Sequence, residues 1–215
     1  PVSRAPASGG AAAAAETVLV TGATSGIGEG LARAFHARGA TVVATGRDPV
    51  ALARLAAACP GLETAVLDVR DADAVARVAA AVEARHPALT TVVSNAGVQR
   101  LVDFAGDGAP PAVPDAAALR DLDLEVDANL KGVLYVARAF APLLPRTAAG
   151  AAAGAPRPRL VHVSSGLAFV PLVAAPIYSA TKAAVHALTV ALREQLRPAG
   201  VQVVELIPPV VDTNL

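Results

Sequence analysis

The sequence has few of the residues that build disulfide frameworks and metal centres. Its 215 residues include one cysteine, Cys59, no methionine and no tryptophan, and aromatic residues make up only 3%. A single cysteine excludes an internal disulfide framework and a cysteine-rich metal site. We therefore expect Cys59 to be a small buried apolar residue and we predict no metal site. No apolar run has the length that a membrane span needs.

Neither sign of charge is in excess. The 18 basic and 18 acidic residues give a formal net charge of zero, so nothing attracts the chain generally to nucleic acid or anionic lipid. Residues 1–15 lack the apolar core of a secretory signal and are rich in Ala, Gly, Ser and Pro. We expect a disordered leader over 1–15, one folded domain over 16–215, a cytoplasmic location, and neither nucleic acid nor membrane as a partner.

The two ends of the sequence suggest a longer gene product. There is no initiator methionine, and the chain stops at Leu215, just after a predicted strand and a proline pair. An α/β domain usually continues beyond such a point. We therefore expect these residues to be part of a longer polypeptide.

Short apolar runs alternate with longer helical ones along the chain. Nearly continuous apolar strands between helices indicate a parallel sheet covered on both faces. Right-handed crossovers make this α/β fold a doubly wound sheet of the Rossmann type, in a single domain. We predict strands at 17–20, 41–44, 64–67, 91–93, 159–164 and 201–207. We predict helices at 29–38, 49–58, 71–85, 115–144 with a break near 121–125, and 176–197.

A glycine-rich turn follows the first predicted strand. Residues 21–28 read TGATSGIG and stand where a strand turns into a helix. Glycine permits positive φ and close approach of the backbone to a ligand, and the free amides of a helix start suit a phosphate. The spacing Gly-xxx-Gly-x-Gly differs from the Gly-x-Gly-xx-Gly dinucleotide fingerprint. An ordinary tight turn is therefore the alternative interpretation.

Ligands of such sheets bind beyond the carboxyl ends of the strands, which directs attention to Arg47 after the second strand. A carboxylate at this point would bind the adenosine ribose of NAD and repel a 2′-phosphate. A guanidinium instead offers bidentate, charge-assisted bonds to a phosphate. This favours NADP(H) over NAD(H). The alternatives are a solvated surface arginine or one that Asp48 neutralises.

A tyrosine and a lysine lie four residues apart on the last predicted helix. Tyr178 and Lys182 share one helix face, and a cation close to a phenol lowers the tyrosine pKa. The tyrosine then becomes a usable acid or base near neutral pH. Ser165, at the end of the fifth predicted strand, is placed to hold a carbonyl or alkoxide oxygen. Taken alone, such a Tyr/Lys pair is more often an ordinary solvated helix face.

Five motifs in one order closely resemble the short-chain dehydrogenase/reductase family. They are the turn 21–28, Asn95-Ala96-Gly97, Asn129, Ser165 and Tyr178-xxx-Lys182. The resemblance runs from about residue 17 to the C-terminus. It implies cofactor contacts from the residues Gly22, Ser25, Gly26, Ile27, Gly28, Asp68, Val69, Asn95, Gly97, Val211 and Thr213.

The resemblance also implies roles in catalysis. Tyr178 would be the general acid in reduction, and Lys182 would bind the nicotinamide ribose and poise Tyr178. Ser165 would orient the carbonyl, while its neighbour Ser164 belongs to the strand. Asn129 would hold a water that links Lys182 to solvent.

The implied activity is that of an NADP(H)-dependent carbonyl reductase or alcohol dehydrogenase. Its substrate would be a small carbonyl compound or secondary alcohol, and the protein would form a homodimer or homotetramer. The alternative from another class is a non-catalytic NADP(H)-binding sensor or scaffold. A dehydratase or epimerase with tightly held cofactor is less favoured, because the chain has no substantial substrate domain.

The chain departs from the family pattern near its end. Family members usually have Pro-Gly where this chain has Pro208-Pro209, and proline lacks an amide hydrogen and fixes φ. The ending PPVVDT resembles a bacterial subgroup named for an operon of cell-wall D-alanylation. The seventh strand and substrate lid of the family are missing from these 215 residues, so the substrate cannot be predicted.

Overall fold

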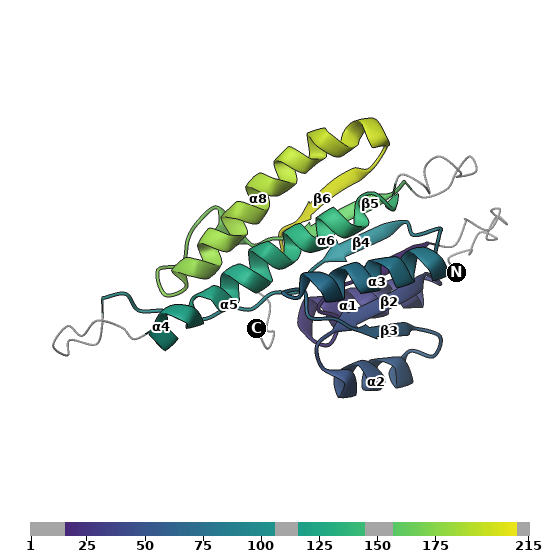
Figure 1. Cartoon of the computed structure of the whole chain (residues 1–215), viewed down its shortest axis with the longest axis horizontal. Helices are drawn as coiled ribbons and strands as arrows, with labels where there is room; N and C mark the ends of the chain where they lie inside the picture. Colours follow the sequence, from purple (N-terminus) through teal and green to yellow (C-terminus); the bar gives the residue numbers. More distant parts are fainter. Residues whose placement is uncertain (1–15, 106–115, 145–156, 210–215) are drawn as a thin grey trace, which may run out of the picture.

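The computed structural model describes residues 16–105, 116–144 and 157–209, apart from the side chain of Ala118. These residues build one parallel sheet with helices on both faces (Figure 1). Its strand order is β3-β2-β1-β4-β5-β6, and every neighbouring pair is parallel. The strands are β1 (Thr17–Val20), β2 (Thr41–Gly46), β3 (Glu63–Val66), β4 (Thr91–Ser94), β5 (Arg159–Val163) and β6 (Gln202–Leu206). The predicted Rossmann-type fold is confirmed.

The helices follow the strands in the expected alternation. They are α1 (Gly26–Ala37), α2 (Pro49–Ala58), α3 (Ala72–Arg85), α4 (Ala116–Asp121), α5 (Asp123–Val126), α6 (Gly132–Phe140) and α8 (Pro176–Leu196). A π-helical turn, Asp127–Lys131, joins α5 to α6, and short 3₁₀ turns cover Gly166–Ala168 and Arg197–Ala199. The strand order reverses between the two central strands, β1 and β4. The chain runs outward from β1 to β3 on one side of this point and from β4 to β6 on the other.

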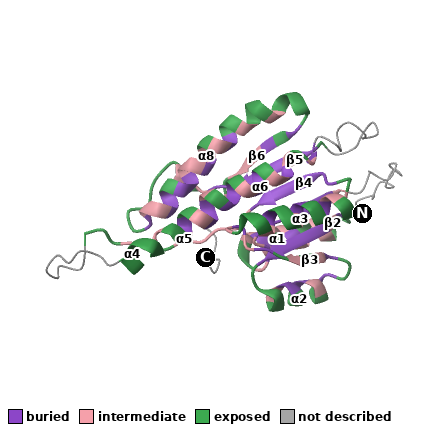
Figure 2. Ribbon diagram, in the orientation of Figure 1, coloured by how far each residue is buried: buried purple, intermediate pink, exposed green. Residues whose placement is uncertain are grey.

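Two apolar cores hold the helices onto the sheet. One packs the side chains of α3, α6 and α8 against the strands, around Leu19, Val92 and Phe140. The other packs α1 and α2 against the opposite face, around Val18 and Leu55. Every residue of β1 and of β4 is buried, as Figure 2 shows along the centre of the sheet. Burial on both faces explains why these strands are continuous apolar runs.

Most element ends lie within one or two residues of the predicted bounds, and two helices differ more. Helix α1 begins at Gly26 rather than at residue 29, because its first turn includes Gly26 and Gly28, which the sequence analysis assigned to the glycine-rich turn. The long helix predicted over 115–144 is broken between Asp121 and Asp123, as expected, but it also contains the π-helical turn. Within the described parts of the chain, no helix is both long enough and apolar enough to cross a bilayer.

Candidate active site

The glycine-rich turn between β1 and α1 is tied to the neighbouring strand β4. Gly22 and Gly26 have φ angles of 64° and 52°, which favour glycine. The Asn95 side chain donates from Nδ2 to the carbonyl oxygens of Thr21 and Gly22, at 3.1 and 3.2 Å. A Cβ added at Gly28 would collide with the Gly22 carbonyl and the Asn95 amide. The turn therefore needs glycine at these positions, and its backbone packs closely against Asn95 at the carboxyl ends of the strands.

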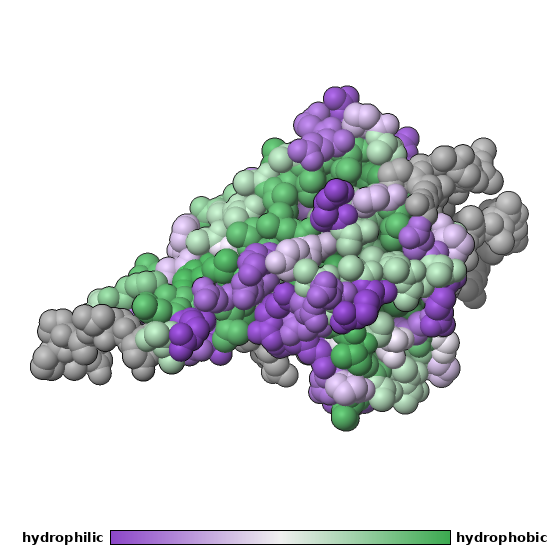
Figure 3. Space-filling view, viewed as in Figure 1, coloured by the Kyte–Doolittle hydropathy of each residue, from purple (hydrophilic) through white to green (hydrophobic). Residues whose placement is uncertain are grey.

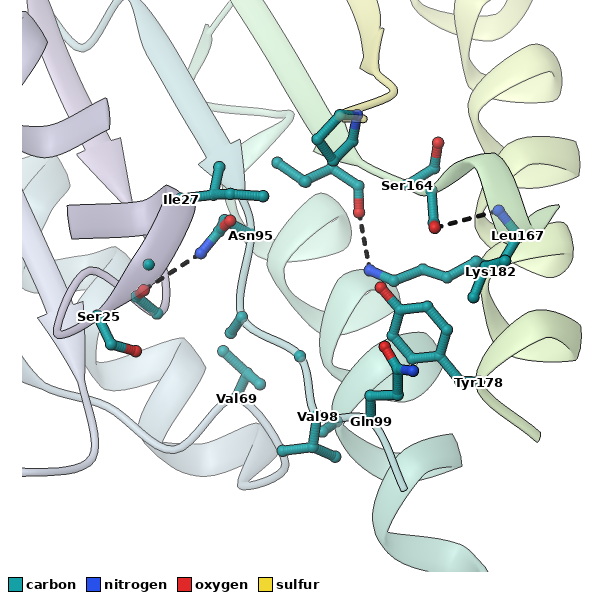
Figure 4. Close-up of a pocket in the computed structure, with 18 of the residues that line it drawn as sticks. Ser25, Ile27, Val69, Asn95, Val98, Gln99, Ser164, Leu167, Tyr178 and Lys182 are labelled. Carbon is teal, nitrogen blue, oxygen red and sulfur yellow. Dashed lines mark hydrogen bonds between the residues drawn. The ribbon is translucent and has the colours of Figure 1, made fainter. Parts of the chain in front are cut away.

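A pocket of about 930 Å³ runs along the carboxyl ends of the strands. Its size lies at the upper end of the range for small-molecule and cofactor sites. Part of it is drawn in Figure 4. The predicted site residues that line it are Gly22, Ser25, Gly26, Ile27, Arg47, Asp68, Val69, Asn95, Gly97, Ser165, Tyr178 and Lys182. Gly28 and Asn129 lie behind this lining, and Val211 and Thr213 lie outside the described residues.

Charged side chains gather at the end of the pocket formed by β2 and β3. Arg70 forms an ion pair with Asp68 at 2.6 Å, and this contact, with a smaller contribution from Arg47, lowers the pKa of Asp68. The Asp48 carboxylate instead caps α2, since it accepts hydrogen bonds from the amides of Val50 and Ala51. Among the described residues Arg47 forms no ion pair and is exposed, so its guanidinium is available to a ligand.

Tyr178 and Lys182 project from α8 at the other end of the pocket. Both are buried, with exposures of 6% and 4%. The Lys182 ammonium donates to the Val163 carbonyl oxygen of β5 at 2.9 Å and lies 5.4 Å from the centre of the Tyr178 ring. Figure 4 shows the tyrosine hydroxyl and the ammonium directed toward the same part of the pocket.

The pKa values of this pair differ from the sequence prediction. Burial raises the pKa of Tyr178, and the charge of Glu125 raises it further, while the Ser165 side chain opposes the shift. Burial also lowers the pKa of Lys182 to about 8. The prediction of a lowered tyrosine pKa is wrong in its net direction, because desolvation of the phenol prevails. The Lys182 hydrogen bond goes to a backbone oxygen instead.

Ser165 lies two residues beyond the end of β5. Its Oγ accepts a hydrogen bond from the Leu167 amide at 3.1 Å, which caps the short 3₁₀ turn. The hydroxyl hydrogen is not used in that contact and is available to an oxygen in the pocket. Ser164, predicted to belong to the strand, lies one residue beyond β5, although its amide still donates to the Leu206 carbonyl of β6 at 3.0 Å.

Asn129 lies in the π-helical turn and forms hydrogen bonds to the backbone of Val98, which lines the pocket. Its Oδ1 accepts from the Val98 amide and its Nδ2 donates to the Val98 carbonyl, both at 2.8 Å. Nδ2 also donates to the Thr181 hydroxyl at 3.2 Å. A Cβ at Gly97 would lie 3.0 Å from Asn129 Oδ1 and 3.7 Å from Lys182 Nζ. The side chain thus joins the segment after β4 to helix α8.

Sequence reasoning missed the buried carboxylate of Glu125. Its Oε1 accepts from the Arg100 amide at 3.0 Å, while Oε2 has no hydrogen-bond partner among the described residues. Burial raises the pKa of this carboxyl group. Acidic residues occupy positions 121, 123, 125 and 127, and only the one at 125 is buried. The sequence pattern therefore carried no signal that could select it.

A parallel sheet with a glycine-rich first βα turn and a buried Tyr/Lys pair beside the same pocket defines an oxidoreductase of the dinucleotide-binding class. The family model described as short chain dehydrogenase matches residues 16–215. The chain belongs to the short-chain dehydrogenase/reductase family, and the resemblance noted from its motifs is confirmed.

Similar proteins include both curated relatives and solved structures. The uncharacterized oxidoreductase DltE of Bacillus subtilis is 35% identical over 199 residues, covering 93% of this chain and 73% of that protein. The closed form of a serine dehydrogenase complexed with NADP+ has a TM-score of 0.78 at 29% identity, covering 93% and 74%. A Brucella melitensis 3-ketoacyl-(acyl-carrier-protein) reductase complexed with NADH has a TM-score of 0.80 at 28% identity, covering 93% and 77%. Structural neighbours thus include complexes with either nicotinamide cofactor.

Proposed function

We propose that the protein is an NADP(H)-dependent carbonyl reductase or alcohol dehydrogenase, with Tyr178 as its acid and base. The observation that carries this proposal is that Ser165, Tyr178 and Lys182 line the same pocket as the glycine-rich turn. A nicotinamide cofactor would supply or accept the hydride when it is bound. A non-catalytic sensor would not need a hydroxyl, a phenol and an ammonium beside one cavity.

The pocket residues fit such a cofactor. Glycine at position 28 keeps the turn tight, because a Cβ there would collide with the Gly22 carbonyl. We propose that the turn holds the pyrophosphate through the pocket-lining residues Gly22, Ser25, Gly26 and Ile27. We assign Asp68 and Val69 to the adenine, and Asn95 and Gly97 to the adenosine ribose. We assign Lys182 and Tyr178 to the nicotinamide ribose, and Val211 and Thr213, outside the described residues, to the nicotinamide.

In reduction, Ser165 would hold the substrate oxygen and Tyr178 would give it a proton. The phenol of Tyr178 is protonated at neutral pH and can donate its proton, although its raised pKa makes it a weaker acid than a free tyrosine. Lys182, with a pKa of about 8, is mostly charged at pH 7 and stabilises the phenolate that forms. Asn129 keeps the Val98 segment in place, and we propose that it also holds the water that resupplies the proton.

The test of this function is oxidation of NADPH and of NADH in the presence of ketones, aldehydes and quinones. We expect turnover with members of at least one of these classes, and faster turnover with NADPH. Cofactor binding without turnover of any member would contradict the enzyme and favour the sensor or scaffold.

Arg47→Ala tests the cofactor preference. The guanidinium would bond to the 2′-phosphate, and charge-assisted hydrogen bonds are among the strong ones, so we expect NADPH affinity to fall about tenfold or more. NADH lacks that phosphate, and its affinity should change by less than about threefold. Both dissociation constants can be measured by fluorescence titration. Arg54→Ala, on the exposed side of α2, is the matched control. An equal loss of affinity for NADPH and NADH in Arg47→Ala would contradict the proposal that Arg47 binds the 2′-phosphate.

We also propose that the protein is cytoplasmic and forms a homodimer or homotetramer. Exposed apolar side chains, among them Val126, Leu134 and Val190, lie on α5, α6 and α8, and apolar surface gathers over this region in Figure 3. Burying such a surface against a second copy would be favourable.

A further inference from the structure

We propose that Gln99 selects the substrate, and that it favours uncharged ketones or aldehydes that carry a hydroxyl or a second carbonyl on the carbon next to the reacting one. The proposal rests on the proposed function, since it concerns the same pocket. Gln99 would bind that neighbouring oxygen while Ser165 and Tyr178 hold the reacting one.

Gln99 lines the pocket together with Tyr178 and Ser165. It is partly buried, and the amide end of its side chain points toward Tyr178 in Figure 4. A glutamine amide offers two donor hydrogens and one acceptor oxygen. Among the described residues the Gln99 side chain has no hydrogen-bond partner, so this amide is available to a ligand.

The backbone on both sides of Gln99 is held by hydrogen bonds. Val98 is bonded through both its amide and its carbonyl to Asn129, and the Arg100 amide is bonded to Glu125. The backbone on both sides of Gln99 is therefore held to the helical segment that contains Glu125 and Asn129. This limits the movement of Gln99, whose side chain lines the pocket.

The charge distribution restricts the substrate. Among the described lining residues, Arg47, Asp68 and Arg70 lie at the β2–β3 end, while Lys182 donates to the Val163 carbonyl. The pocket lining also includes the apolar side chains of Leu101, Leu167 and Leu172. Lys182 is the one charged side chain among the described lining residues beyond β4 and β5, and its ammonium already bonds to the Val163 carbonyl, so a substrate carboxylate would lose water for little gain. The region suits an apolar body with one further polar group, which the Gln99 amide can bond.

The test compares 2-hydroxy-1-phenylethanone with 1-phenylethanone in wild type and in Gln99→Leu. These ketones differ only in the hydroxyl next to the carbonyl. We measure kcat/KM with NADPH for each, and the affinity of each ketone for the enzyme–NADP+ complex by calorimetry. Gln195→Leu, the same substitution at an exposed position of α8, is the matched control.

We expect the preference for the hydroxyketone, taken as a ratio of kcat/KM values, to fall about tenfold in Gln99→Leu and not in Gln195→Leu. The affinity ratio should fall similarly. An unchanged affinity ratio in Gln99→Leu, or no binding of the hydroxyketone by wild type, would overturn the proposal. If wild type binds the hydroxyketone but reduces neither ketone, the proposed function fails, while the affinity ratio still decides the role of Gln99.

Discussion

Replacing Tyr178 with phenylalanine should lower kcat by about a thousandfold and change the NADPH dissociation constant by less than about threefold. The substitution removes the hydroxyl that we propose as the proton donor, and positioned acids and bases contribute about 10²–10⁴ to a rate. The phenyl ring preserves the buried apolar contacts of the tyrosine, which is 6% exposed. The measurement is single-turnover and steady-state reduction of the best substrate of the panel.

Tyr135→Phe, at a partly buried position of α6 outside the pocket, is the matched control for Tyr178→Phe. It should retain turnover within about threefold, because it removes a hydroxyl that does not face the substrate. Turnover of Tyr178→Phe close to that of wild type would exclude Tyr178 as the proton donor, whatever the cofactor affinity.

Replacing Lys182 with methionine should abolish most of the activity and yet stabilise the free protein at pH 7. Burial lowers the pKa of Lys182 from 10.5 to about 8, so the folded state binds this proton more weakly than the unfolded state does. Below pH 8 the buried ammonium therefore costs stability. Methionine removes that cost but also the hydrogen bond to Val163, so we expect a gain of about 2 kcal/mol in the free energy of unfolding.

The pH dependence separates this electrostatic effect from better packing. As the pH rises from 8 to 10.5, wild-type Lys182 loses its proton in the folded state first, and the stability advantage of Lys182→Met should shrink. Urea unfolding at pH 7 and pH 10 measures the two values. Lys131→Met removes a lysine that is paired with Asp127 at the surface and should change stability by less than about 1 kcal/mol. An advantage of Lys182→Met that is equal at both pH values would contradict the electrostatic explanation.

The fold was predictable because its signals are local and repeated. The strand predicted at 17–20 is β1 to the residue, and Pro49 after Asp48 marked the start of α2. The rule that ligands lie beyond strand ends then selected Arg47, Asp68, Asn95 and Ser165, which all line the pocket. Parallel strands bring their carboxyl ends to one edge of the sheet, so residues far apart in sequence meet there without any further assumption.

Features that depend on three-dimensional context were not predictable. Nothing in the pattern of 115–144 distinguishes a π-helical turn from an α-helical one, and that turn places Asn129 against Val98. Glu125 looks like its exposed acidic neighbours until the segment after β4 lies over it. The pKa of Tyr178 was predicted in the wrong direction because helical spacing reveals the nearby lysine but not the burial of the phenol.

The acceptor that holds Lys182 is a peptide carbonyl, that of Val163. A peptide oxygen is present whatever side chain occupies the position, so the anchor exists wherever β5 keeps its path. Over evolutionary time, residue 163 can drift among strand-forming amino acids without loosening the ammonium. The contact therefore requires conservation of the lysine on α8 and not of the side chain on β5. At this contact the strand tolerates sequence change far better than the helix does.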